Sequence, residues 1–193
     1  MHHKHHTEGL ILGSSLHGET GKVFFVFTRD LGMLYASAAG IRKMSSKLRY
    51  VLQDFSYVKI DLIKGKDFWR ITSASKTNAL EEVIKQKDAL KVFARIAKLL
   101  RRLLPEQVKN DVLFAEVLNG LLVLEKAKNK EEVMNIEIII VLRVLSNLGY
   151  IGDIDSFENL IKSPLEEELL LEMSKNKLRA ISEINKALKE TQL

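Results

Sequence analysis

The 193-residue sequence has no cysteine, only two prolines and no long apolar run. Because a disulfide or a thiolate-ligated metal needs cysteine, neither can form within these residues. The longest apolar runs, such as residues 138–142, are much shorter than the roughly 20 apolar residues of a membrane-spanning helix. The polar, histidine-rich first residues also lack the apolar core of a secretory signal. We therefore expect a cytoplasmic protein that does not bind a membrane.

Acidic residues are scarce in the first two-thirds of the chain. The net charge of +5 divides into +6 for residues 1–80, +4 for residues 81–130 and −5 for residues 131–193. Hydrophobic and charged fractions of 46% and 28% are typical of a globular chain and not of a disordered one. This length is sufficient for one medium domain or two small ones.

The sequence also lacks the motifs of the common enzyme classes. Its ten glycines are scattered and form neither a Walker motif nor a dinucleotide-binding fingerprint. His17 has no serine, aspartate or second histidine arranged around it as a relay, and Asp153 and Asp155 form only a local pair of carboxylates. We therefore expect no catalytic residue, no cofactor and no enzymatic activity.

Histidines at the start of the chain resemble a purification tag that Lys4 interrupts. Imidazoles bind transition metals, but a metal site also needs a fixed scaffold and second-shell partners. A frayed terminus supplies neither, so we expect no physiological metal site here. The residues are His2, His3, His5 and His6.

The first part of the chain has a β pattern. Five segments rich in Val, Ile, Phe, Tyr and Trp alternate with glycine or charged turns, at residues 8–15, 22–28, 32–39, 55–64 and 68–74. In the fourth segment, alternation places Val58, Ile60 and Leu62 on the core face. Five short strands with one longer connection, between the third and the fourth, predict a closed barrel of the OB type. An open meander or an SH3-like barrel is the alternative.

After Ser75 the hydrophobic period becomes helical. Asn78, with an acid three positions later, predicts the N-cap of a first helix that Pro105 ends. Residues 111–127 are apolar nearly all round and predict a central second helix. The sequence therefore predicts an α+β protein, with a five-stranded OB-type barrel in residues 1–76 and an all-α helical domain in residues 77–193.

Two further helices complete the predicted helical domain. Asn129 predicts the N-cap of a helix that Gly149 terminates. Ser163, followed by proline and by an acid at the third position, predicts the start of a last helix that runs to about Glu190. We expect a break in it near residues 174–176.

The most distinctive feature of the sequence is a cluster of four cations between the third and fourth predicted strands. No acid interrupts the cluster before Asp54, so these cations do not neutralise acids nearby in sequence and are suited to a polyanion. An ordinary solvated loop is an equal alternative on charge alone. The cluster consists of Arg42, Lys43, Lys47 and Arg49.

Other cations at strand ends or on the fifth strand extend this predicted phosphate track, and exposed aromatics would add stacking surfaces for bases. Arg70 alternatively pairs with Asp61 across a hairpin. The candidate stacking residues Tyr35, Tyr57 and Phe68 are more commonly core residues in a small barrel. The additional cations are Lys22, Arg29, Lys64, Lys66 and Arg70.

A second basic group lies near the end of the first long predicted helix, at Lys98, Arg101 and Arg102. The helix dipole favours cations there without any ligand. With the leucines around it, the group would also form a mixed basic and apolar surface for a partner.

Several short segments, in a fixed order, resemble the bacterial RecO family. They are residues 7–12 (TEGLIL), 17–19 (HGE), 27–32 (FTRDLG), 39–42 (AGIR) with Ser45, Ser46 and Leu48, 52–55 (LQDF) and 69–72 (WRIT). Residues 113–114 and 145–150 (LSNLGY) are similar more loosely.

This resemblance implies an OB fold that binds single- and double-stranded DNA, a helical domain and no enzymatic activity. It implies strand annealing and, together with RecR, help for RecA in displacing single-strand-binding protein (SSB), which would place the protein at the nucleoid. It also suggests that Lys98, Arg101 and Arg102 receive the acidic C-terminal tail of SSB. Many members carry a four-cysteine zinc module after the Leu-Gly-Tyr segment, and these residues contain no cysteine, so we expect no zinc.

From the residues alone, two other functions fit the basic barrel. It could be a protein-interaction module that binds an acidic partner. It could also bind RNA, because phosphate contacts do not distinguish the two polymers without a contact to the 2′-hydroxyl.

Overall fold

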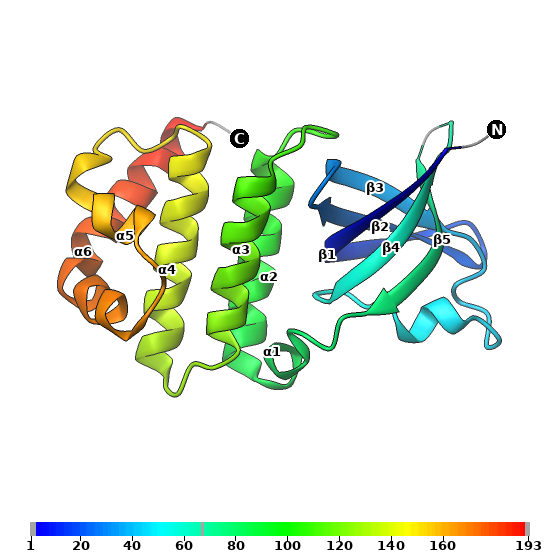
Figure 1. Ribbon diagram of the computed structural model, residues 1–193, viewed down its shortest axis with the longest axis horizontal. Coiled ribbons are helices and arrows are strands. Elements are labelled where there is room, and N and C mark those ends of the chain that lie inside the picture. The colour runs from blue at the N-terminus through cyan, green and yellow to red at the C-terminus, as the bar shows by residue number, and fades with distance from the viewer. Residues whose placement is uncertain (1–2, 67, 192–193) are drawn as a thin grey trace.

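A computed structural model describes residues 3–66 and 68–191; His2, part of the predicted histidine cluster, lies outside them. Five strands form a closed barrel at one end of an elongated molecule, and the α helices stand side by side at the other end (Figure 1). This confirms the predicted α+β class. The strands are β1 (Lys4–His17), β2 (Gly21–Thr28), β3 (Gly32–Ala38), β4 (Tyr57–Lys64) and β5 (Trp69–Lys76).

The barrel closes in the strand order β1-β2-β3-β5-β4. The long strand β1 pairs antiparallel with both β2 and β4, and an irregularity between Ile11 and Gly13 bends it between these two partners. A short parallel contact between β3 and β5, with Ala36 opposite Trp69, completes the closure. The closed order confirms the OB-type barrel and excludes the open meander.

Strand β1 begins four residues before the predicted start at residue 8. Its first residues are polar and carry no hydrophobic alternation, yet Lys4 pairs with Ile63 and His6 with Asp61 on β4. The expected frayed terminus is therefore wrong for His5 and His6, because backbone pairing with β4 holds them in the sheet.

The barrel has two buried surfaces. Its interior holds Val58, Ile60 and Leu62, as the alternation predicted, with Phe24 and Leu34 from the neighbouring strands. In β1 three consecutive residues are buried: Ile11 faces the barrel interior, and Leu10 and Leu12, on the outer side, pack into the core shared with the helices.

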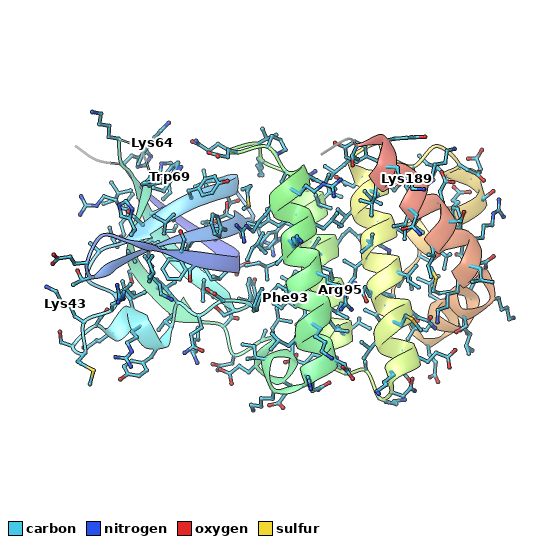
Figure 2. All side chains as sticks on the ribbon, turned by 180° about the vertical axis from the view of Figure 1, so that it is seen from behind. Lys43, Lys64, Trp69, Phe93, Arg95 and Lys189 are labelled. Carbon is cyan, nitrogen blue, oxygen red and sulfur yellow. The ribbon has the colours of Figure 1, made fainter. Side chains whose placement is uncertain are left out.

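One continuous apolar core joins the outer side of the barrel to the helices. Phe27 of β2 packs edge-on against Phe114, with ring centroids 5.3 Å apart. The ring centroids of Phe55 and Phe93 are 5.6 Å apart, and Figure 2 shows Phe93 on a helix at the junction. The helices are α1 (Glu81–Lys85), α2 (Lys87–Leu103), α3 (Asp111–Leu124), α4 (Lys130–Asn147), α5 (Glu158–Lys162) and α6 (Glu167–Glu190).

The first predicted helix is two helices. Asn78 has φ = 60° and is not an N-cap; α1 begins at Glu81 after Leu80, which also has a left-handed backbone. Extended Gln86 separates α1 from α2, and α2 ends two residues before Pro105. The capping prediction at Asn78 is wrong, since a left-handed residue does not have the extended backbone that an N-cap needs.

The predicted cap of α4 is confirmed. Asn129 accepts a hydrogen bond from the backbone N–H of Glu132 at 2.9 Å, and Gly149, with φ = 79°, follows the last turn. The central position of α3 is also confirmed, because both Leu113–Phe114 and Val117–Leu118 are buried.

The predicted start of the last helix is wrong. Ser163 lies directly after the short helix α5, and α6 begins at Glu167. The buried guanidinium of Arg143 on α4 donates to the carbonyls of Leu160 and Ser163, which holds this segment outside α6. A five-residue helix such as α5 has too little periodicity to be recognised in sequence.

The expected break in α6 does not occur. The helix is continuous through residues 174–176, where Ser174 Oγ and Asn176 Nδ2 each donate to a carbonyl four residues earlier. Polar side chains that bond back to the helix in this way do not interrupt it.

Among residues 3–66 and 68–191, no helix combines the length and the hydropathy needed to cross a membrane.

We expect Gly32→Ala to destabilise the protein more than Gly18→Ala. Both glycines have positive φ, +71° and +60°, so an alanine strains either backbone by roughly 1–2 kcal/mol. Only at Gly32 would the added Cβ clash with a backbone atom, the Val108 carbonyl oxygen, whereas nothing lies within 4 Å at Gly18. Urea unfolding should give a loss of about 2–3 kcal/mol for Gly32→Ala. Equal losses for the two variants would contradict this.

Candidate nucleic-acid interface

The last residues of the connection between β3 and β4 return to the helices, where Phe55 packs against Phe93, but its residues 39–52 form a structured loop at the end of the barrel away from the helices (Figure 1). We call it the cationic loop. Gly40 turns the chain with φ = 67°, and the short 3₁₀ helix η1 (Lys47–Tyr50) follows. Ile41 and Leu52, each 3% exposed, insert into the barrel core at the two ends of this segment. The loop is therefore anchored by apolar side chains and presents its polar side chains outward.

The four predicted cations of the loop are all exposed, and Figure 2 shows Lys43 at the outer end of the barrel. Arg42 donates to the carbonyl of Glu19 at 2.9 Å, which ties the loop to the β1–β2 turn. Arg49 lies against the sulfur of Met44 at 3.3 Å. Within the described residues, no carboxylate forms an ion pair with any of the four cations, Arg42, Lys43, Lys47 and Arg49.

Two of the four cations surround a hollow of about 260 Å³ together with a cation from β2. Lys22 reaches it from β2, where its ammonium also donates to Ser14 Oγ at 3.3 Å. We call this site the cationic hollow. It is lined by Lys22, Ile41, Arg42, Arg49 and Leu52.

The sequence analysis missed the most exposed aromatic residue of this region. Tyr50 is 60% exposed, and the guanidinium carbon of Arg49 lies 5.7 Å from the centre of its ring. Met44, 83% exposed, lies on the same loop. The position of Tyr50 directly after Arg49 was the signal available in the sequence. An aromatic residue beside cations in a loop between strands is suited to base stacking.

The β4–β5 turn joins this end of the barrel. Figure 2 shows Lys64 there, and Lys66 and Arg70 are exposed on the same turn and strand. Phe68 packs edge-on against His17, with ring centroids 5.4 Å apart, so this turn touches the end of β1. The structure thus brings these cations to the same end of the molecule as the cationic loop.

The alternative pairing of Arg70 with Asp61 is wrong. The register places Arg70 opposite Ile63, and the carboxylate of Asp61 instead contacts Lys4 at 2.7 Å and His6 at 2.5 Å. The hydrogen bond from Lys4 holds the pKa of Asp61 below its ordinary value. The extra residues of β1 supply these partners, and they lay outside the predicted strand.

Arg29 and Tyr57 lie at the junction with the helices and not at the cationic end. Glu8 accepts hydrogen bonds from the Tyr57 hydroxyl at 2.8 Å and from Arg29 Nε at 3.1 Å. The guanidinium of Arg29 lies 4.9 Å from the ring centre of Phe114 on α3. The structure does not bring these two predicted site residues together with the others.

Tyr35 is half-buried against Phe25, at 5.3 Å between ring centroids.

Tyr57→Phe tests the hydroxyl at this junction. Burial, with the hydrogen bond to Glu8, raises the pKa of Tyr57 to about 12 from 10.0. As the pH rises, the Tyr57 hydroxyl therefore loses its proton in the unfolded chain before it does so in the folded chain. The contribution of the hydroxyl to stability is present below pH 10 and is lost as the pH rises toward 12. We expect the variant to be about 1 kcal/mol less stable near neutral pH. Urea titrations should show that the difference in the free energy of unfolding between the native chain and Tyr57→Phe shrinks above pH 10. A difference that stays constant with pH would contradict the role given to the Tyr57 hydroxyl. Tyr50→Phe, which removes an exposed hydroxyl, is the control.

The three cations of the second basic group have different surroundings. Arg101 stacks on Phe25 of β2, with its guanidinium 3.6 Å from the ring centre, so it faces the barrel. Arg102 donates to the carbonyl of Leu188 and the hydroxyl of Thr191, so it faces the end of α6. Lys98 is exposed on α2. Both arginines therefore have roles within the molecule, and the partner role of the group stays a prediction.

The described part of the chain contains no group of three or more His, Cys, Asp or Glu side chains placed to hold a metal ion.

The closed five-stranded barrel, the helices behind it and the cations at its outer end define an OB-fold protein with a candidate surface for polyanions. Comparison with known proteins agrees: residues 1–79 match the family model described as "Recombination protein O N terminal". The barrel part of the chain therefore matches the RecO family, and the predicted resemblance is confirmed.

Curated relatives extend the likeness beyond the barrel. A protein named DNA repair protein RecO from Caldanaerobacter subterraneus subsp. tengcongensis is 27% identical over 155 residues, which cover 78% of this chain and 60% of that protein. One of the same name from Thermodesulfovibrio yellowstonii is 29% identical over 173 residues, 87% of this chain and 65% of that protein. The chain thus spans about three-fifths of the length of these relatives.

Proposed function

We propose that this chain acts in DNA repair as a RecO-type recombination mediator that binds single- and double-stranded DNA on the cationic end of its barrel. The observation that carries the proposal is the cluster of four exposed cations on the cationic loop, without a carboxylate partner in the described residues and beside the exposed ring of Tyr50. The names of the relatives support the role in DNA repair.

The geometry supports a nucleic-acid partner over an acidic protein. OB folds bind oligonucleotides on the face of strands 2 and 3, between the β1–β2 and β4–β5 turns. Here His17 and Phe68 bring these two turns into contact, and the cationic loop joins the first of them through Arg42. A strand lying across this end would meet phosphate-binding cations from three segments and one stacking ring.

The activity that we propose needs no covalent chemistry. Two complementary strands repel each other through their phosphates, and a protein that neutralises both lowers the barrier to annealing. We propose that the chain anneals strands in this way and, together with RecR, helps RecA to replace SSB on single-stranded DNA. It would act at the nucleoid in the cytoplasm as a binding protein and not as an enzyme.

A protein contact with SSB is a further part of this proposal. The acidic tail of SSB would meet the exposed ammonium of Lys98 on α2, since Arg101 and Arg102 are engaged within the molecule.

Fluorescence anisotropy with a labelled single-stranded DNA tests the proposal, with matched duplex DNA and RNA of the same sequence as competitors. We expect salt-sensitive binding of single-stranded and duplex DNA, and acceleration of annealing between complementary strands in a separate assay. Preference for the RNA would favour the RNA-binding alternative. Absence of binding to every nucleic acid at low salt would overturn the proposal.

A further inference from the structure

We propose that the cationic hollow binds the terminal phosphomonoester of a DNA strand; this inference rests on the proposed function and specifies one site within it. The hollow brings cations from three segments to one volume of about 260 Å³. Lys22 comes from β2, Arg42 from the start of the cationic loop and Arg49 from η1. Lys22 is twenty residues before Arg42 and on another element, so the fold brings it to the two arginines of the loop.

Each of the three cations keeps free hydrogen-bond donors. Lys22 gives one bond to Ser14 Oγ, Arg42 one to the Glu19 carbonyl and Arg49 one to the Met44 sulfur. An ammonium has three donors and a guanidinium five, so most of the donors stay available for a ligand. A phosphate offers several acceptor oxygens to such a set, and guanidinium groups suit it particularly well.

The charge of the hollow matches a terminal phosphate better than an internal one. Within the part of the chain that the structure describes, three cations and no carboxylate line it. A phosphodiester inside a strand carries one negative charge, whereas a phosphomonoester carries about 1.5 to 2 at pH 7. A site distinguishes the additional charge and the additional terminal oxygen only if several cations converge on one phosphate. The three cations of the hollow are placed to converge in this way.

The rest of the lining suits the end of a nucleotide chain. Ile41 and Leu52 are 3% exposed and form an apolar floor on which a deoxyribose can lie. Tyr50 does not line the hollow, but it follows Arg49 in η1, and its exposed ring is available to the terminal base. A bare anion would use only the cations, so the combination favours a nucleotide end over free phosphate.

The test is a competition experiment with one short single-stranded DNA, about eight nucleotides long, a length within the site sizes of OB folds. It is prepared with hydroxyl groups at both ends, with a 5′-phosphate, with a 3′-phosphate, and with each terminal phosphate capped as its methyl ester. We expect one phosphorylated form to bind roughly five- to tenfold more tightly than the hydroxyl form, about the net effect of one ordinary hydrogen bond at a solvent-exposed site. The methyl-capped form, which has the phosphorus but only one negative charge, should lose most of this gain.

Two variants separate the hollow from the wider DNA surface. Arg49→Gln should remove the preference for the phosphorylated end, while Lys66→Gln, on the β4–β5 turn outside the hollow, should weaken all forms alike and leave their ratio unchanged. Thermal melting of both variants checks that each is folded; Arg42→Gln repeats the test if Arg49→Gln is not.

Equal, salt-sensitive binding of all forms by the native chain would overturn the terminal-phosphate site and leave the proposed DNA binding intact. A preference that persists in Arg49→Gln and Arg42→Gln would overturn the assignment to this hollow. Failure of every form to bind would overturn both proposals together.

Discussion

Replacing the four cations of the cationic loop with alanine is expected to weaken binding of single-stranded DNA by about 10²- to 10³-fold near 0.1 M salt. Each phosphate contact releases counterions, and for single strands the logarithm of affinity changes by roughly 0.7 per contact for each tenfold change in salt. Four lost contacts therefore have a large combined effect. Anisotropy titrations of the native chain and the variant measure it; the substitutions are at Arg42, Lys43, Lys47 and Arg49.

The matched control removes the same charge elsewhere. Four exposed lysines at the start of α2 and on the α3–α4 connection, in the helical part of the molecule, are replaced together. Because screening confines surface charge effects to about 10 Å at this salt concentration, the control should lose no more than a few-fold in affinity. Equal losses in both variants would show that only net charge matters, which contradicts a localised site. The control lysines are Lys87, Lys126, Lys128 and Lys130.

The same four-cation variant should remain folded. Exposed cations contribute little to stability, so its free energy of unfolding should stay within about 1 kcal/mol of the native value. A large loss of stability would instead assign the cluster a structural role. The loss of DNA binding by the variant would then reflect unfolding and not the removal of phosphate contacts.

Phe114→Ala is expected to destabilise the protein by about 3–5 kcal/mol, the usual cost of removing a fully buried phenylalanine. Phe114 is completely buried, and its ring meets Phe27 of β2, Tyr57 of β4 and the guanidinium of Arg29. The resulting cavity would lie between α3 and two barrel strands, in the apolar core that joins both parts of the molecule. In a chain of this size the melting temperature should fall by roughly 10 °C.

Val112→Ala is the control for this prediction, since Val112 lies on the same helix but is 62% exposed. We expect it to change stability by less than about 0.5 kcal/mol. Urea unfolding followed by circular dichroism and by tyrosine fluorescence measures both variants. A loss below about 1 kcal/mol for Phe114→Ala would show that the barrel and the helices do not depend on this contact.

Local patterns in the sequence were sufficient for the architecture. The alternation of Val58, Ile60 and Leu62 identified a barrel strand because side chains on a strand point alternately inward and outward. The cap at Asn129 was equally predictable, because a capping side chain and its backbone partner are only three residues apart.

Local patterns failed where distant residues decide the local conformation. Asn78 resembled a cap, but the turn from β5 into α1 requires a left-handed backbone there. Ser163 resembled a helix start, but Arg143 on α4 holds its carbonyl and the helix begins later. In both cases the sequence offered a valid local motif that the packing of other elements overrode.

The candidate site was predictable in part for the same reason. The four cations of the loop are close in sequence, and their clustering was visible at once. The role of Arg29 was not, because its partners Glu8 and Tyr57 come from other strands and Phe114 comes from a helix. The exposure of Tyr50 also depends on how Ile41 and Leu52 anchor the loop, which no local pattern specifies.

The most direct test of the central claim is the salt dependence of single-stranded DNA binding by the native chain. If about five phosphates are neutralised at the cationic end, the logarithm of affinity should fall with the logarithm of salt concentration at a slope of roughly −3 to −4. The four-cation variant should retain a slope of no more than about −1. A slope near zero for the native chain, or the same slope for both proteins, would contradict DNA binding at this surface.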